Sequence, residues 1–142
     1  MRALFDVNAL IALFDPAHVH HERAHSWWKQ NKASGWASCP LTENGFVRIL
    51  SQPKYPNAIP AHDAILRLSQ SIARGGHAFW VDDVSLTDGR VFHGAPILGP
   101  KPITDLYLLA LAVRNAGRLV TFDQGIPLAA VEGAGPKHRV VL

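Results

Sequence analysis

The chain has 142 residues, of which 48% are hydrophobic and 18% are charged, and these fractions are typical of a globular domain rather than of a disordered chain. Its single cysteine excludes an internal disulfide framework, and the N-terminal apolar run is interrupted by Asp6 and is too short for a membrane span. The sequence therefore predicts one domain over residues 1–142, soluble and cytoplasmic, with no membrane partner. The net charge of +3 does not by itself identify a partner.

The first half of the chain predicts strands that alternate with helices. Residues 3–5 form a short apolar strand that ends at Asp6, and a helix follows directly and runs through Phe14. A second helix is predicted over 18–31, in which Trp27 and Trp28 pack against the core. The next elements are a strand over 35–38, a helix over 40–50 that begins at Pro40, and, after a turn-rich stretch, a helix from residue 61 that stops at Gly75 and Gly76.

The second half continues the alternation. A strand is predicted over 77–83, and residues 85–102 carry scattered Gly and Pro residues that favour a loop. An apolar helix over 103–117 closes at Gly117, and two strands follow, over 118–123 and over 138–142. Strands that alternate with helices predict an α/β fold with a mostly parallel central sheet flanked by helices.

Four carboxylates share one position, because each lies at the end of a predicted strand or near the start of a predicted helix: Asp6, Glu43, Asp105 and Asp123. Taken singly, each has a structural explanation as a helix cap, as a first-turn acid that the helix dipole favours, or as a turn residue. Helix N-termini and strand C-termini meet at one edge of an α/β sheet, where ligands bind, so the four acids can converge there.

A cluster of carboxylates requires a cation, because like charges a few ångströms apart repel strongly. No Cys or His accompanies these acids in a ligand pattern, and ligation by oxygen alone favours Mg²⁺ or Mn²⁺. The four acids are among only 11 Asp and Glu, against 14 Lys and Arg. The surrounding surface is therefore more basic than the net charge implies, which suits an anionic polymer as substrate.

The acids occur in the segments LFDVNALIAL, PLTENGFVRIL, ITDLYLLALA and RLVTFD, in the order Asp, Glu, Asp, Asp. In this order and in these apolar frames, the chain resembles a PIN domain over essentially its whole length. It is most similar to the toxin ribonucleases of the VapC type from bacterial toxin–antitoxin pairs. The resemblance implies an α/β PIN-like fold and a Mg²⁺-dependent endoribonuclease that hydrolyses RNA with a metal-activated water.

The resemblance also implies roles for individual residues. Asp6, Asp105 and Asp123 match the metal-binding acids of the family, and Glu43 completes the catalytic quartet by assisting a second metal or orienting the water. Asn8 and Thr121 match polar companions of these acids. The number of metal ions, one or two, stays open.

Further expectations concern partners. The resemblance implies an RNA substrate such as a tRNA or rRNA loop, a cognate antitoxin protein, and a homodimer. Residues 85–102 and the helix over 60–74 are the regions where we expect the RNA to be selected. The alternative function is a non-catalytic PIN-like scaffold that binds RNA or protein, which would be expected to have lost some of the acids.

Other patterns in the sequence favour less specific explanations. His21 and His25 have the spacing of a zinc pair but no third ligand of suitable spacing, so a structural role is favoured. Arg48 either pairs with Glu43 or contacts a phosphate group. Receiver domains and aspartate-nucleophile phosphatases are disfavoured, because a single acid follows the first strand and Asn8 occupies the position of a second one.

Overall fold

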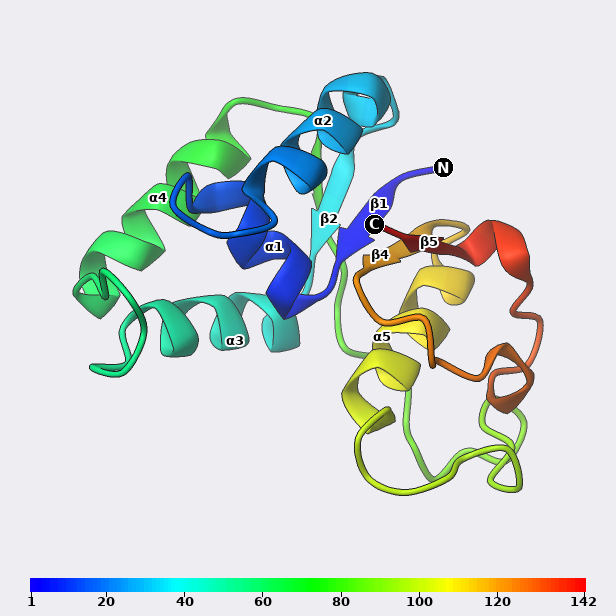
Figure 1. The fold of residues 1–142 in the computed structure, drawn as a ribbon. Helices are drawn as coiled ribbons and strands as arrows, with labels where there is room; N and C mark the ends of the chain where they lie inside the picture. Colours follow the sequence, from blue (N-terminus) through cyan, green and yellow to red (C-terminus); the bar gives the residue numbers. More distant parts are fainter.

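The computed structural model describes residues 1–142, which form a central sheet with helices on both of its faces (Figure 1). Three-residue 3₁₀ turns lie at Lys32–Ser34, Leu128–Ala130 and Pro136–His138. The helices and strands, in chain order, are β1 (Ala3–Phe5), α1 (Val7–Phe14), α2 (His21–Asn31), β2 (Trp36–Ser38), α3 (Pro40–Leu50), α4 (Ala61–Ala73), β3 (His77–Phe79), α5 (Ile103–Arg114), β4 (Arg118–Thr121) and β5 (Arg139–Val141).

The five strands form one sheet in the order β3-β2-β1-β4-β5, and all four neighbouring pairs are parallel. The predicted α/β fold with a mostly parallel sheet is confirmed. In the centre, Ala3 pairs with Trp36 on one side and with Arg118 on the other. Because every strand runs in the same direction, all of the carboxyl ends lie at one edge of the sheet.

Successive residues of the strands pack alternately into two separate hydrophobic cores, one on each face of the sheet. Leu4 and Leu119 belong to the core under α5, whereas Phe5 and Val120 belong to the core formed with α1, α3 and α4. Figure 1 shows the same division, with α1 to α4 on one side of the strands and α5 on the other. Side chains that alternate along a strand point to opposite faces, so a parallel sheet covered on both faces needs strands that are apolar throughout.

The element boundaries differ from the predictions at several ends. Helix α2 begins at His21 rather than at residue 18, after a turn in which the Asp15 carboxylate accepts the N–H of Ala17. Strand β3 ends at Phe79 rather than at residue 83, because its neighbour β2 ends at Ser38 and offers little backbone to pair with beyond that point. The segment 85–102 has no helix or regular strand, as predicted.

Two further features belong to the core. The rings of Trp27 and Trp28 contact Phe5 edge-on, at centroid distances of 5.8 and 6.0 Å, so their predicted packing role is confirmed. None of the helices combines the length and the apolar character that a membrane crossing would need.

A glycine brings α3 close to the start of α1. A Cβ atom at Gly45 would lie 2.6 Å from Cγ2 of Val7, which is closer than side-chain atoms pack. This approach places the first turn of α3, which carries Glu43, beside the first turn of α1, which Asp6 precedes.

We expect Leu109→Ala to lower the free energy of unfolding by about 3 kcal/mol, because it leaves a cavity in the core under α5. Leu109 is fully buried there. Denaturant unfolding measures the change, and Leu98→Ala is the matched control, since Leu98 is 87% exposed. The control is expected to change the stability by no more than about 0.5 kcal/mol, and an equal loss in both variants would contradict the assignment of the core.

Candidate active site

Asp6 follows β1 directly and caps the N-terminus of α1. Its Oδ1 accepts the backbone N–H of Ala9 at 2.7 Å, and the residue is only 5% exposed. Burial raises the pKa of this carboxyl, the hydrogen bonds from Thr121 and Ala9 oppose that rise, and the charge of Asp123 adds to it. No Lys, Arg or His forms an ion pair with Asp6, so within the protein only hydrogen bonds stabilise its ionised carboxylate.

Asp105 lies in the first turn of α5 and is half-buried. Its pKa is raised to about 6, first by burial and then by the charges of Asp6 and Asp123. A carboxylate responds to a like charge in this way only when the two groups lie close together. Asp6 after β1, Asp105 in the first turn of α5 and Asp123 after β4 thus lie near enough at the carboxyl edge of the sheet for their charges to influence one another.

Thr121 connects two of these acids. It is the last residue of β4 and is fully buried, and its Oγ1 accepts the backbone N–H of Asp123 at 2.9 Å. The Thr121 hydroxyl also hydrogen-bonds to the Asp6 carboxylate. This hydrogen bond opposes the rise in the pKa of Asp6 that burial causes. The structure thus places Thr121 beside the acids, whereas Asn8 is exposed and its side chain makes no hydrogen bond.

Glu43 makes different contacts from the other three acids. Its Oε1 accepts a hydrogen bond from the Ser38 hydroxyl at 2.6 Å, and its charge is not among those that shift the pKa of Asp6 or Asp105. Of the two options for Arg48, the ion pair with Glu43 is not formed, and Arg48 is exposed. Mutual charge effects thus connect three of the four predicted acids, and a role for Glu43 beside them stays a prediction.

The sequence reasoning missed Ser38 and His77, which lie next to Glu43. The Ser38 hydroxyl contacts Nε2 of His77 at 2.8 Å as well as Glu43. In the sequence, Ser38 ends the predicted strand over 35–38 and His77 begins the predicted strand over 77–83, and only these two positions hinted at a contact. Whether such residues of neighbouring parallel strands lie side by side depends on the register of the strands, which the sequence does not reveal.

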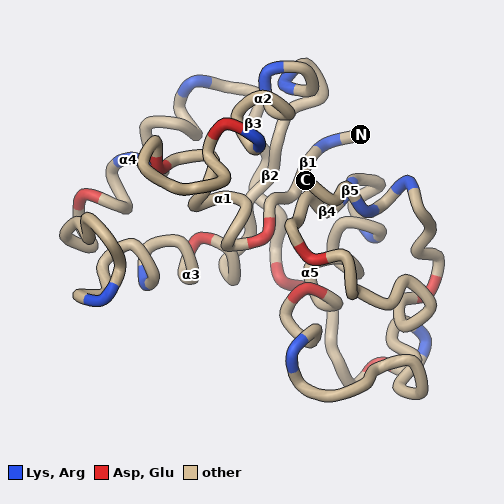
Figure 2. Tube along the Cα trace, in the orientation of Figure 1, with Lys and Arg blue, Asp and Glu red and all other residues tan.

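The three converging acids offer oxygen donors that suit a hard divalent cation. One oxygen of Asp6 and one of Asp123 are engaged by the backbone N–H groups of Ala9 and Gly125, at 2.7 Å each, and the second oxygen of each is available. Acidic positions gather around the junction of α3, β1 and α5 (Figure 2). In these side-chain orientations, no three His, Cys, Asp or Glu residues already lie close enough to hold a metal ion, so binding would require the carboxylates to turn toward one another.

The histidines of α2 do not form such a site either. The rings of His21 and His25 stack at 5.3 Å, and Nδ1 of His21 lies 2.8 Å from the carbonyl oxygen of Ala12. The structural explanation for this pair is consistent with these contacts, because one ring nitrogen is already engaged by the backbone.

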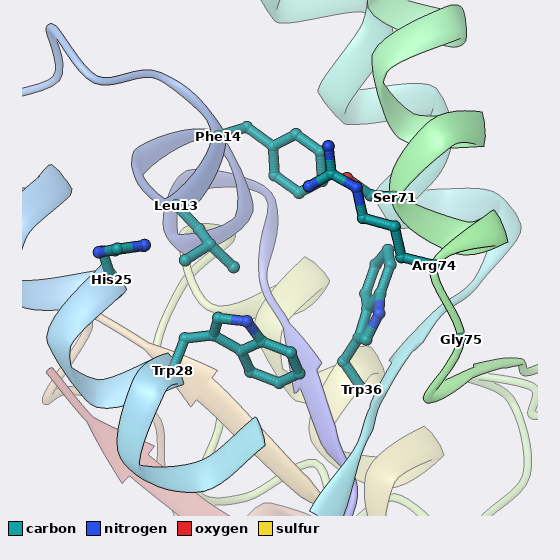
Figure 3. A pocket seen from close by; sticks show the side chains of 8 residues that line it. All are labelled: Leu13, Phe14, His25, Trp28, Trp36, Ser71, Arg74 and Gly75. Atoms are coloured by element: carbon teal, nitrogen blue, oxygen red, sulfur yellow. The ribbon is translucent and has the colours of Figure 1, made fainter. Parts of the chain in front are cut away.

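A separate pocket of about 350 Å³ lies between α1, α2, β2 and α4 (Figure 3). Trp36 lies beside Arg74 and Ser71 on one side of the pocket, and Trp28 lies on the other side, near Leu13 and His25. None of the four acids lines this pocket. It is therefore not a candidate metal site. The remaining lining residues are Phe14 and Gly75.

We expect Asp105→Asn to stabilise the metal-free protein at about pH 7 by about 1 kcal/mol, after allowance for the partial exposure of the side chain. The folded-state pKa of Asp105, about 6, is above its ordinary value of 3.8, so the folded protein binds this proton more tightly than the unfolded chain does. Its contribution to stability is present below the unfolded pKa and is lost as the pH rises through the folded pKa.

Denaturant unfolding in EDTA at about pH 7 and about pH 4 measures this effect, and the gain from Asp105→Asn should largely disappear at the lower pH. Asp88→Asn is the control, because hydrogen bonds from Arg90 lower the pKa of Asp88, and this variant should show no gain. A gain of equal size at both pH values would contradict the electrostatic coupling.

Comparison with known proteins identifies the family, although no family model matches the chain. Ribonuclease VapC44 of Mycobacterium tuberculosis is 50% identical over 142 residues, which cover 100% of both chains. Ribonuclease VapC38 of the same species is 50% identical over 125 residues, or 87% of this chain and 86% of the relative. Ribonuclease VapC39 is 44% identical over 135 residues, or 94% and 96%. The resemblance to VapC-type ribonucleases is thus confirmed, and the chain belongs to the VapC family of ribonucleases.

Proposed function

We propose that this chain is a metal-dependent endoribonuclease and the toxin of a toxin–antitoxin pair. The observation that carries the proposal is the electrostatic coupling of Asp6, Asp105 and Asp123 at the carboxyl edge of the sheet, in a chain of the VapC family. Carboxylates that lie close together and are partly removed from water suit a divalent cation, because the cation offsets both their burial and their mutual repulsion.

Asp6, Asp105 and Asp123 would hold Mg²⁺ or Mn²⁺. When bound, such an ion supplies an activated water and neutralises charge on the phosphoryl group under attack. The protein contributes the placement of the acids: Asp6 is fixed by the N–H of Ala9, and Asp123 by the hydroxyl of Thr121 and the N–H of Gly125. Glu43 would orient the attacking water or accept its proton.

The substrate would be RNA, and a structured loop such as that of a tRNA or rRNA is favoured because proteins read RNA through exposed loops rather than through duplex grooves. The partner would be a cognate antitoxin protein that covers the acids. The active form would be a homodimer.

Asp6→Asn and Asp105→Asn are each expected to lower RNA cleavage by at least about 100-fold, because each removes a charge needed to bind the metal. The Asn at position 6 keeps an oxygen that can cap α1, so the fold should persist. The measurement is incubation of the antitoxin-free protein with total RNA, with Mg²⁺ or with EDTA, followed by mapping of the fragment ends.

Glu22→Gln is the control for loss of an acidic charge, since Glu22 is exposed in the first turn of α2, outside the regions expected to select the RNA, and its substitution should leave cleavage unchanged. Cleavage that survives both active-site substitutions would contradict the assignment of the site. A folded protein that cleaves no RNA in the presence of Mg²⁺ would favour the scaffold function instead.

Metal binding is also expected to raise the melting temperature. A cation present at about 100 times its Kd stabilises the folded state by about 2.7 kcal/mol. Differential scanning fluorimetry with Mn²⁺ should show this shift for the unmodified protein and for Glu22→Gln, but not for Asp105→Asn. An equal shift in all three proteins would place the metal elsewhere.

A further inference from the structure

A chain of hydrogen bonds leads from β3 to Glu43. Nε2 of His77 lies 2.8 Å from the Ser38 hydroxyl oxygen, and this hydroxyl donates to Oε1 of Glu43 at 2.6 Å. Ser38 is fully buried at the end of β2, and Glu43 lies in the first turn of α3. The three side chains thus belong to three different elements: Ser38 and Glu43 lie at the carboxyl edge of the sheet, and His77, the first residue of β3, contacts Ser38 from the neighbouring strand.

The direction of these hydrogen bonds follows from counting protons. A serine hydroxyl has one proton, and an ionised carboxylate can only accept. Since Ser38 donates its proton to Glu43, its oxygen must accept from His77, and His77 must carry its proton on Nε2. The chain therefore runs from the His77 N–H, through the Ser38 O–H, to the Glu43 carboxylate.

The His77 ring is itself fixed in place. His77 pairs with Trp36 in the parallel ladder, and the two rings contact each other edge-on at 4.5 Å. Burial lowers the pKa of His77, and the nearby Arg2 guanidinium lowers it further, although the charge of Glu43 opposes both. The Arg2 side chain is held by the carbonyls of Trp36 and Gly76, so its position next to the histidine is constrained.

Ser38 is not needed to complete the N-terminus of α3. The N–H of Cys39 is accepted by the Thr42 hydroxyl at 3.0 Å, and the N–H of Leu41 is accepted by the Asp82 carboxylate at 3.2 Å. The backbone of this helix end is therefore satisfied by other side chains. The Ser38 hydroxyl is directed at a single target, the carboxylate of Glu43.

We propose that Ser38 and His77 are positioning residues for Glu43, holding its carboxylate by one oxygen so that the other is presented to the reaction. This inference rests on the proposed function. Oε2 of Glu43 makes no hydrogen bond within the protein. Without the Ser38 hydroxyl, the Glu43 side chain regains rotational freedom and spends less time in a productive orientation.

A double-mutant cycle tests the proposal. We expect Glu43→Ala to lower kcat by about 100-fold and Ser38→Ala to lower it by about tenfold, with little change in KM for RNA. The double variant should have the kcat of Glu43→Ala alone, because Ser38 has no target once Glu43 is absent. A merely structural role for Ser38 would instead lower kcat in both backgrounds.

Conservative variants of His77 provide a second readout. His77→Gln keeps a nitrogen donor near the position of Nε2 and should retain most of the activity, whereas His77→Phe keeps the ring shape without the donor and should lower kcat. Ser51→Ala is the control for loss of a serine hydroxyl, since Ser51 caps the C-terminus of α3 and its hydroxyl donates to the Val47 carbonyl, at the opposite end of the helix from Glu43.

Failure of this inference can be told apart from failure of the proposed function. If the unmodified protein cleaves no RNA, or if Glu43→Ala cleaves like it, the proposed function or the role of Glu43 fails and the inference falls with it. If Glu43→Ala is impaired but Ser38→Ala and His77→Phe are not, only the inference is overturned. Long-range ¹H–¹⁵N NMR on the folded protein gives a test that needs no substitution: a proton on Nε2 of His77 is expected, and a neutral ring protonated on Nδ1 instead would refute the hydrogen-bond chain.

Discussion

The repulsion between Asp6, Asp105 and Asp123 is the constraint on which the rest of the site depends. Their proximity follows from an all-parallel sheet, because the ends of β1 and β4 and the start of α5 come to one edge. Burial raises the pKa of Asp105, and the charges of Asp6 and Asp123 add to the rise, which brings this pKa to about 6. A protein keeps such a cluster only if something compensates for it, and a divalent cation is the compensation that carboxylates most readily accept.

Local hydrogen bonds reduce the unfavourable free energy of burying and clustering these carboxylates, but they do not cancel it. Asp6 is almost fully buried, yet it receives hydrogen bonds from the N–H of Ala9 and the hydroxyl of Thr121. The same threonine accepts the N–H of Asp123, so one buried hydroxyl supports two acids from different strands. Glu43 differs from these acids, because its carboxylate accepts a hydrogen bond from the neutral Ser38 hydroxyl. The edge therefore contains three acids whose charges are coupled and a fourth that a serine hydroxyl holds in place.

Much of this arrangement could be predicted from the sequence. Apolar runs that end in an acid predicted β1 and β4, and the alternation of strands and helices predicted the parallel sheet that brings Asp6 and Asp123 to one edge. The contacts of Glu43 could not be predicted, because they depend on the register that sets Trp36 opposite His77 and on the rotamers of Ser38 and Glu43. Neither leaves a periodic signal in the sequence. The end of β3 at Phe79 was mispredicted for a related reason, since a strand's length depends on its neighbour.

The central claim is that Asp6, Asp105 and Asp123 together bind the metal ion used in RNA cleavage. Anomalous diffraction from crystals grown with Mn²⁺ tests this claim most directly, because it locates the ion without relying on activity. The account predicts an anomalous peak between the three carboxylates, with their free oxygens turned toward it. A peak elsewhere, or none there in protein that cleaves RNA only when Mn²⁺ is present, would contradict the account.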